Sequence, residues 1–304
     1  MNTRSAVTGA FSYTGKYITR LLLEQGKNVI TLTSRKDDLN LFNEEIQAFP
    51  FQFSNPAALT ESLRGVDTLY NTYWVRFDHK QTTFGSAVEN TRILIQAAKA
   101  AGVRRFVHVS ITNPTLESPL PYFSGKAQLE DDLKASGMSY AILRPTVIFG
   151  DEDILINNIA YLLRRFPIFA IPGAGDYQLQ PIFVEDMAQL AVEAGSRDEN
   201  ITWDAVGPEI YTFRELVQLT RSAVGSSTKL ILLPPGLVLA LSRLIGFFVG
   251  DVVLTHEEIQ GLMANLLIST EAPTGHTSLR DWLQTNAQQV GSQYASELKR
   301  HYRP

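Results

Sequence analysis

The sequence predicts an α/β protein with a doubly wound parallel sheet, followed by a smaller and mainly helical C-terminal lobe. Two observations support this fold class. Short apolar runs alternate with helix-length segments through the first half of the chain, a pattern typical of parallel strands joined by helical crossovers. A turn containing Gly9 and Gly15 joins the first expected strand to the first expected helix. Folds of this class bind their ligands at the carboxyl ends of the strands.

The expected elements follow from hydrophobic periodicity and from Gly, Pro and capping residues. Strands are expected at 4–8, 28–33, 49–53, 67–72, 103–109 and 140–144, with helices at 14–25, 84–101 and 122–136. After Gly150 the alternation ends and helical patterns dominate. We therefore expect a sheet domain at residues 1–150 and a second lobe at residues 151–304. The lobe is interleaved with the first domain and includes a strand near 181–184.

Composition excludes several classes of protein. The chain has 304 residues, of which 44% are hydrophobic and 19% charged, which is typical of a globular protein. The formal net charge of −4 gives no basic surface for nucleic acid. The absence of cysteine excludes disulfides and a cysteine nucleophile, and the five histidines form no close pair, so no metal site is expected. No leader or spanning helix is expected, which favours a cytoplasmic protein.

The turn from Thr8 to Gly15 is the first candidate site. A dinucleotide pyrophosphate needs a tight turn, close backbone approach and a helix N-terminus. Gly9 and Gly15 have the outer positions of a GxxGxxG spacing, and Ser12 replaces the middle glycine. The alternative is an ordinary strand–helix turn in a domain that has lost its cofactor.

The residues after the second expected strand bear on which dinucleotide binds. The run there is Ser34-Arg35-Lys36, and the first acidic residue is Asp37. Because an acid at this point selects NAD and a basic group admits the 2′-phosphate, the run favours NADP(H) over NAD(H). A solvated basic turn is the alternative.

Tyr122 and Lys126 are the candidate acid/base pair. Their i, i+4 spacing places both on one helix face, just after the expected strand that ends near Ser110. A nearby ammonium lowers the pKa of a phenol, which can then pass a proton to or from a substrate oxygen. Ser110 and Thr112 are hydroxyls that could polarise a carbonyl. The alternative is an amphipathic surface pair beside a strand-end hydroxyl.

These motifs together resemble a known family. The segments TGAFSYTG (8–15), GVRRFVHVS (102–110), SPLPYFSGKAQLE (118–130), LRPTVIFG (143–150) and PIFVEDMA (181–188) resemble an atypical short-chain dehydrogenase/reductase of the extended, epimerase-like type. The chain is most similar to the group containing the Rossmann-fold accessory subunit of respiratory complex I and its bacterial relatives. The resemblance implies that residues 1–150 are an NAD(P)-binding Rossmann domain.

The resemblance also implies roles for individual residues. Tyr122 would be the acid/base, Lys126 would tune it and hold the nicotinamide ribose, and Thr112, or else Ser110, would bind the substrate oxygen. The residues expected to bind the cofactor are Gly9, Phe11, Ser12, Tyr13, Thr14, Gly15, Ser34, Arg35, Lys36, Asn71, Thr72, Lys126, Pro145 and Thr146.

Substrate contacts are expected from two segments. Tyr73, Trp74 and Arg76 follow the fourth expected strand, beside the expected nicotinamide pocket; aromatic core packing is the alternative. Asn157 and Asn158 are placed there by resemblance alone.

The apolar segment 234–250 suggests a lipophilic small-molecule substrate, because one amphipathic stripe cannot account for every face of such a helix. With only Arg243 as a basic residue, contact with a membrane surface is less favoured. The alternative is that neighbouring helices at 257–267 and 279–285 cover the remaining faces.

Two functions remain open. The first is an NAD(P)-dependent oxidoreductase acting on a carbonyl or alcohol, with transient oxidation as in epimerases as a variant of the same chemistry. The second is a catalytically silent NAD(P)-binding sensor or accessory subunit. The Tyr–Lys pair favours the first and the altered glycine turn favours the second.

Overall fold

The computed structural model describes residues 3–34, 39–42 and 45–301. The chain divides into two compact units. The first contains residues 1–145 and 184–205, and the second contains residues 146–183 and 206–304. Each unit is described by itself.

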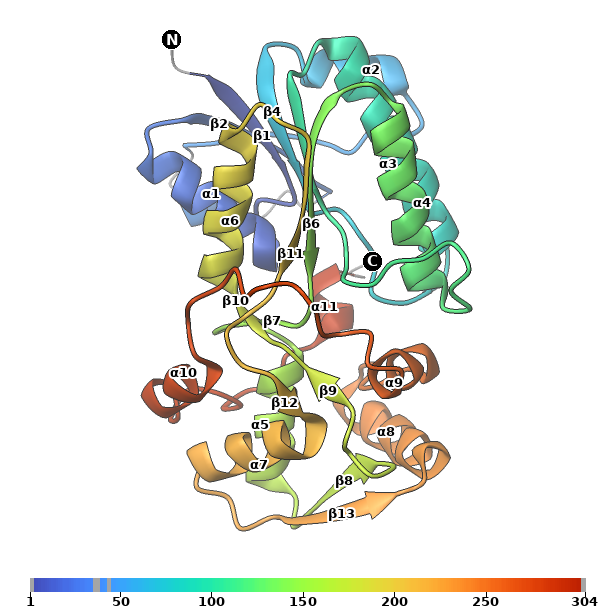
Figure 1. Ribbon diagram of the computed structural model, residues 1–304, viewed down its shortest axis with the longest axis vertical. Coiled ribbons are helices and arrows are strands. Elements are labelled where there is room, and N and C mark those ends of the chain that lie inside the picture. Colours follow the sequence, from blue (N-terminus) through green and yellow to red (C-terminus); the bar gives the residue numbers. More distant parts are fainter. Residues whose placement is uncertain (1–2, 35–38, 43–44, 302–304) are drawn as a thin grey trace. The chain divides into compact units, whose positions relative to one another are not determined.

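A parallel seven-stranded sheet forms the centre of the first unit in the described part of the chain (Figure 1). Its strands, in spatial order, are β11 (Ile201–Ala205), β6 (Ser139–Pro145), β5 (Arg105–Val109), β4 (Val66–Asn71), β1 (Arg4–Thr8), β2 (Asn28–Leu32) and β3 (Gln47–Phe49). The strand order reverses direction at β1, so the switch point of the sheet lies between β1 and β4. The predicted doubly wound fold is confirmed. Two details differ: β3 ends where the expected strand 49–53 began, and β11 was not among the expected strands.

Helices cover both faces of this sheet. The helix α1 (Tyr13–Glu24) packs beside α6 (Val184–Ser196) on one face. The other face carries α2 (Pro56–Ser62), α3 (Phe84–Ala101) and α4 (Pro121–Ala135), and a short 3₁₀ turn spans Leu39–Phe42. Fully buried strand residues such as Leu69, Phe106 and Ile142 form the core between the layers. Because helices cover both faces of the sheet, side chains on both sides of its strands are buried, and the strands are rich in apolar residues.

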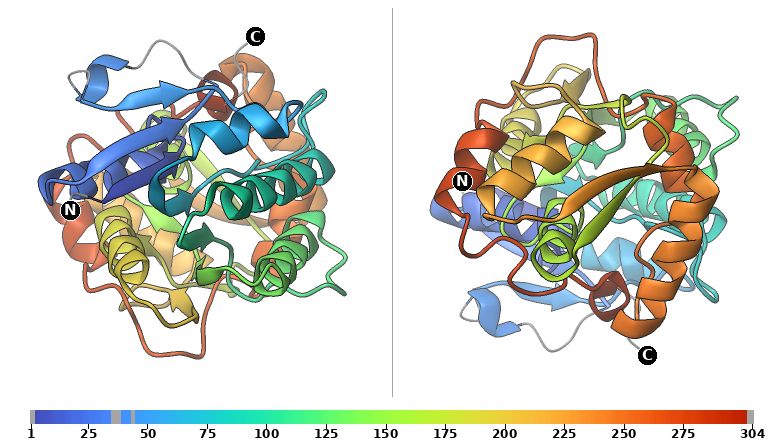
Figure 2. Two further views of the ribbon diagram at one scale, coloured as in Figure 1. Left: turned by 90° about the horizontal axis from the view of Figure 1, so that it is seen from above. Right: turned by 90° about the horizontal axis from the view of Figure 1, so that it is seen from below.

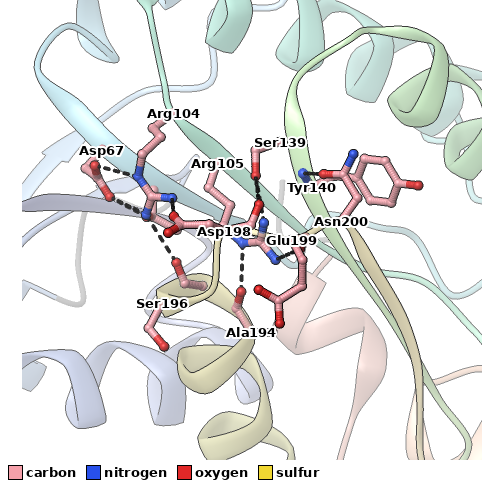
Figure 3. A network of polar contacts seen from close by, with 12 residues as sticks. Asp67, Arg104, Arg105, Ser139, Tyr140, Ala194, Ser196, Asp198, Glu199 and Asn200 are labelled. Atoms are coloured by element: carbon pink, nitrogen blue, oxygen red, sulfur yellow. Dashed lines mark hydrogen bonds and ion pairs between the residues drawn. The ribbon is translucent and has the colours of Figure 1, made fainter.

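A polar network attaches the segment 184–205 to the rest of the first unit, residues 1–145 (Figure 3). The fully buried Arg105 donates from Nε to the Ala194 carbonyl at 2.7 Å and from Nη2 to the Glu199 carbonyl at 3.0 Å. Its neighbour Arg104 forms an ion pair with Asp67 at 3.0 Å. A buried guanidinium without partners is costly, so these contacts hold the end of α6 against the start of β5.

The second unit combines short strand pairs with helices. Its elements are β7 (Ile148–Phe149), α5 (Leu155–Arg165), β8 (Ile168–Pro172), β9 (Gln178–Leu179), β10 (Ile182–Phe183), β12 (Tyr211–Thr212), α7 (Phe213–Ala223), β13 (Lys229–Leu233), α8 (Pro235–Val249), α9 (His256–Met263), α10 (Leu279–Thr285) and α11 (Glu297–His301). The strands pair as β7 with β10, β9 with β12 and β8 with β13. The core of the unit contains Ile156, Leu163, Leu216 and Trp282.

The helix α8 differs from the expectation that neighbouring helices cover its faces. Its buried positions are Val238, Ser242 and Gly246, whereas Phe247 is 82% exposed and Phe248 is 77% exposed. The core-packing interpretation is therefore wrong for this helix, because its large side chains point outward and its small ones inward. Among the residues that the structure describes, none of the helices is both long and apolar enough to cross a membrane.

Candidate functional site

The glycine turn lies at the carboxyl end of β1, beside the switch point of the sheet. Gly9 has φ of 67°, in the left-handed region that favours glycine. A Cβ atom at Gly15 would lie 2.2 Å from the carbonyl oxygen of Gly9, so only glycine allows α1 to start this close to β1. Both glycines therefore have the conformational roles that a dinucleotide-binding turn requires.

Ser12 fits the middle position without backbone strain. It is the N-cap residue of α1 with φ of −97°, and its hydroxyl donates to the Gly9 carbonyl at 2.6 Å. The side chain does not cap the helix, and the first turn of α1 holds no acidic residue. The N–H groups and positive dipole at this end can thus face a pyrophosphate. These residues fit an NAD(P) cofactor through backbone contacts, whereas the Ser12 hydroxyl is bonded within the turn. Near them, Phe11 is buried and Tyr13 and Thr14 are half-buried.

Asn71 and Thr72 join the end of β4 to the end of β1. The Thr72 hydroxyl donates to the Thr8 carbonyl at 2.6 Å, and the Thr8 hydroxyl donates to Asn71 Oδ1 at 3.1 Å. Asn71 Nδ2 lies 3.1 Å from His108 Nδ1. Asn71 and Thr72 were both expected to bind the cofactor, and their side chains bond the end of β4 to its neighbouring strands.

His108 is buried, and its two ring nitrogens differ in their hydrogen bonding. Its Nδ1 contacts Asn71, whereas its Nε2 has no hydrogen-bond partner. Burial lowers the pKa of His108 well below its ordinary value, and the charge of Lys126 lowers it further. The imidazole is therefore neutral, with the proton on Nε2 if Nδ1 accepts from the Asn71 amide.

The residues expected to select the dinucleotide are only partly described. Ser34 is exposed just after β2. Arg35 and Lys36 lie outside the described residues.

Lys126 is deeply buried in the first unit. Its Nζ donates to the Val109 carbonyl at 2.7 Å and lies 4.3 Å from the centre of the Trp74 ring. Only 2% of the side chain is exposed. Burial lowers the pKa of Lys126 to about 7, against a smaller raising effect from Glu130.

Tyr122 belongs to an aromatic cluster with Trp74 and Phe84. The rings of Tyr122 and Trp74 meet edge to face with centroids 5.6 Å apart, and those of Tyr122 and Phe84 meet in the same way at 5.8 Å. Trp74 therefore contacts both members of the Tyr122–Lys126 pair. The Trp74 indole Nε1 is buried without a hydrogen-bond partner. Trp74 was expected to contact the substrate. In the structure its ring contacts Tyr122, the candidate acid/base.

Ser110 and Thr112 differ in how their hydroxyls are placed. The Ser110 hydroxyl donates to Glu130 Oε1 at 2.6 Å, and the same carboxylate pairs with Arg144 at 2.5 Å. Ser110 is therefore committed to a buried ion-pair network. Thr112 is fully buried, and its backbone N–H donates to the carbonyl of Pro145 at 3.0 Å. The bond from Ser110 to Glu130 therefore disfavours Ser110 as a substrate-binding hydroxyl.

Glu130 is the site residue that sequence reasoning missed. It is 2% exposed, and it bonds both Ser110 and Arg144. A signal was present, since Tyr122, Lys126 and Glu130 recur at every fourth position of one helix.

Three expected substrate residues have structural roles instead. Asn157 Nδ2 donates to Asp153 at 3.0 Å, and its Oδ1 accepts from the N–H of Gly291. Asn158 bonds the backbone of Ala295 through both its amide atoms. The expectation that these asparagines face a substrate is corrected, because they attach α5 to the C-terminal segment.

Tyr73, the third of these residues, packs against the stacked rings of Phe51 and Phe53, and its hydroxyl accepts from Asn90. The guanidinium of Arg76 lies 5.7 Å from the centre of the Phe77 ring. In the second unit, the Thr146 hydroxyl donates to the Gln180 carbonyl, so this expected cofactor contact is also bonded internally.

Comparison with known proteins agrees with this geometry. Residues 9–159 match the family described as NAD(P)H-binding. The matched residues include the glycine turn and the Tyr122–Lys126 pair. The chain is 21% identical over 287 residues to the mitochondrial NADH dehydrogenase [ubiquinone] 1 alpha subcomplex subunit 9 of Arabidopsis thaliana, covering 88% of this chain and 71% of that protein.

Two solved structures show the same fold. An NADPH-dependent quinone oxidoreductase from Escherichia coli, complexed with NADPH, has a TM-score of 0.74 at 22% identity and covers 92% of this chain and 99% of its own. MoeE5 in complex with UDP-glucose and NAD has a TM-score of 0.70 at 19% identity, covering 94% and 98%. Both likenesses support the fold of the chain as a Rossmann-like parallel sheet with flanking helices.

Proposed function

We propose that this NAD(P)H-binding protein is an NADP(H)-dependent oxidoreductase acting on a carbonyl or alcohol carbon of a small lipophilic molecule. One observation carries the proposal: Tyr122 and Lys126 converge on Trp74 in the unit whose glycine turn fits a pyrophosphate. The cofactor, when bound, supplies or accepts the hydride. The remaining chemistry belongs to the side chains of the chain.

Tyr122 would hold and deliver the proton at its hydroxyl oxygen, while Thr112 orients the substrate oxygen. Lys126 would provide positive charge beside the phenol. Because burial lowers the pKa of Lys126 to about 7, its charge near neutral pH is sensitive to whatever enters the site. The aromatic surface of Trp74 and Phe84 excludes water and suits an apolar substrate.

The preference for NADP(H) is supported by the run Ser34-Arg35-Lys36, with no acidic residue before Asp37. It agrees with the NADPH bound to the quinone oxidoreductase of similar fold.

A second function is favoured by a specific observation. The Trp74 ring lies against the Lys126 ammonium at 4.3 Å, so the side chain that should reach a ribose is covered. A protein that keeps the nucleotide as a structural or sensory group, as an accessory subunit of a larger assembly, would have such a closed site. The Arabidopsis relative is a subunit of an NADH dehydrogenase by name.

One experiment separates the two functions. NADPH oxidation is followed with a panel of short-chain quinones and aldehydes, for the parent protein and for Tyr122→Phe. Turnover that falls by ~10²-fold in the variant supports the oxidoreductase, since this is the usual contribution of a positioned acid/base. Tight NADPH binding without turnover on any member of the panel supports the accessory role.

A further inference from the structure

The outward face of α8 is an apolar surface fixed to the second unit. Its exposed large residues are Leu237, Leu241, Leu244, Phe247 and Phe248. They recur at the i, i+3, i+4 and i+7 spacing of one helix face. This face is therefore continuous along the helix. Figure 2, in its view from below, shows β13 running directly into α8, and on the neighbouring strands Ile168 is 53% exposed and Leu232 48% exposed.

Small residues on the inner face of α8 fix the rotation of the helix about its axis. Gly246 packs so closely that a Cβ there would lie 2.5 Å from the Asp251 carbonyl oxygen. Ser242 is buried, and its hydroxyl bonds back to the Leu239 carbonyl. Rotating the helix would force its largest side chains into the space that these small residues fill.

The C-terminal end of α8 is also fixed. Gly250 ends the helix with φ of 66°. The carboxylate of Asp251 then accepts from the backbone N–H groups of Glu297 and Leu298 at 2.8 and 3.0 Å. Phe247 and Phe248, whose ring centroids lie 5.7 Å apart, are thus presented from an anchored turn.

The charge of this surface is opposite in sign to the net charge of the whole chain. The segment from Lys229 to Gly250 contains two basic residues, Lys229 and Arg243, and no acidic residue, whereas the whole chain has a net charge of −4. Both basic side chains are exposed. An apolar face with cationic and no anionic groups is complementary to an anionic lipid surface.

We propose that the α8 face, defined by these five exposed residues and Arg243, binds the surface of a phospholipid bilayer with anionic headgroups. Leucine and phenylalanine side chains enter the interfacial region, and Arg243 and Lys229 face the headgroups. A protein partner fits less well, because such interfaces use about one hydrogen bond per 100–200 Å² and the exposed side chains of α8 offer only Arg243 as a hydrogen-bonding group. The inference does not depend on the proposed oxidoreductase activity.

Vesicle flotation of the full chain tests the proposal. Parent protein is mixed with phosphatidylcholine vesicles, or with vesicles containing a fifth of phosphatidylglycerol. We expect binding to both, and stronger binding to the anionic vesicles at low salt. The double variant Phe247→Ser/Phe248→Ser should lower partitioning at least about tenfold on both, because interfacial binding scales with buried apolar area.

Arg243→Glu should lower partitioning about fivefold or more on the anionic vesicles only, which is the scale of one basic residue near such a surface. The control is Leu116→Ser/Ile210→Ser, which removes two exposed apolar residues that do not belong to α8. This control should bind as the parent does. Circular dichroism and NADPH titration would check that every variant keeps its fold.

Three results would overturn the proposal. The first is a parent protein that floats with neither vesicle. The second is equal loss of binding in the control pair. The third is a parent that is dimeric by light scattering and becomes monomeric in Phe247→Ser/Phe248→Ser without any vesicle binding, which would assign the α8 face to a second copy of the chain.

Discussion

Replacing Lys126 by Met tests the electrostatics of the candidate site without a known substrate. Burial lowers the pKa of Lys126 from an ordinary value of 10.5 to about 7. Between these two values the unfolded chain binds a proton that the folded chain does not, so this group makes the fold more stable as pH rises. Below pH 7 the full penalty for burying the charge is present.

The size of the effect follows from the shift. Each pKa unit corresponds to about 1.4 kcal/mol, so the penalty at pH 6 is about 5 kcal/mol and falls to about 2 kcal/mol at pH 9. Lys126→Met removes this penalty at both pH values. It also removes the hydrogen bond to Val109 and the contact with Trp74, which costs about 1–3 kcal/mol at any pH.

Urea unfolding at pH 6 and pH 9, followed by tryptophan fluorescence, measures the outcome. We expect Lys126→Met to be more stable than the parent at pH 6 by about 2–4 kcal/mol, and this advantage to shrink by about 3 kcal/mol at pH 9. Lys99→Met is the control, because Lys99 also donates to a backbone carbonyl but from an exposed position. A difference between Lys126→Met and parent that stays constant with pH would refute the reasoning.

Three further predictions concern the cofactor and the hydroxyl groups. Gly15→Ala should destabilise the fold by about 1–3 kcal/mol and weaken NADPH binding, because its Cβ would lie 2.2 Å from the Gly9 carbonyl oxygen. Unfolding and NADPH titration measure both effects. The control is Gly85→Ala, whose Cβ would have its nearest neighbouring atom 3.8 Å away. Arg35→Asp should weaken NADPH binding and spare NADH, and equal affinities of the parent for both would contradict the proposed preference. Ser110→Ala should destabilise the fold by about 1–3 kcal/mol, since it leaves the buried Glu130 carboxylate with one hydrogen bond fewer. The KM for substrate should change little. A raised KM with unchanged stability would instead show that Ser110 contacts the substrate.

The central sheet could be predicted because its strands are buried on both faces. The strands β2 and β5 each contain three apolar residues in five and follow a helix that ends at a glycine, Gly26 or Gly102, and this pattern is local. The strand β11 gave no such signal. It pairs only with β6 at one edge of the sheet, and its sequence, Ile-Thr-Trp-Asp-Ala, mixes polar and apolar residues.

The candidate site was predictable where helix periodicity sets it. Tyr122 and Lys126 follow from spacing, whereas the partner of Glu130 is Arg144 on β6, which only the tertiary fold brings near. The roles of Asn157 and Asn158 were missed for the same reason, because their partners lie 134 and 137 residues away in the chain. The apolar character of α8 was visible in the sequence, but which faces are exposed depends on packing.

Transfer of deuterium from NADPH dideuterated at C4 to the carbonyl carbon of an aldehyde, followed by mass spectrometry of the alcohol formed, tests the central claim most directly. The measurement uses the parent protein and Tyr122→Phe with the aldehyde panel at neutral pH, because deuterium on the alcohol carbon does not exchange with water. The proposed function predicts a deuterium-labelled product whose rate of formation falls ~10²-fold in the variant. NADPH that binds tightly and transfers no deuterium to any member of the panel would contradict an oxidoreductase and leave the protein a nucleotide-binding accessory subunit.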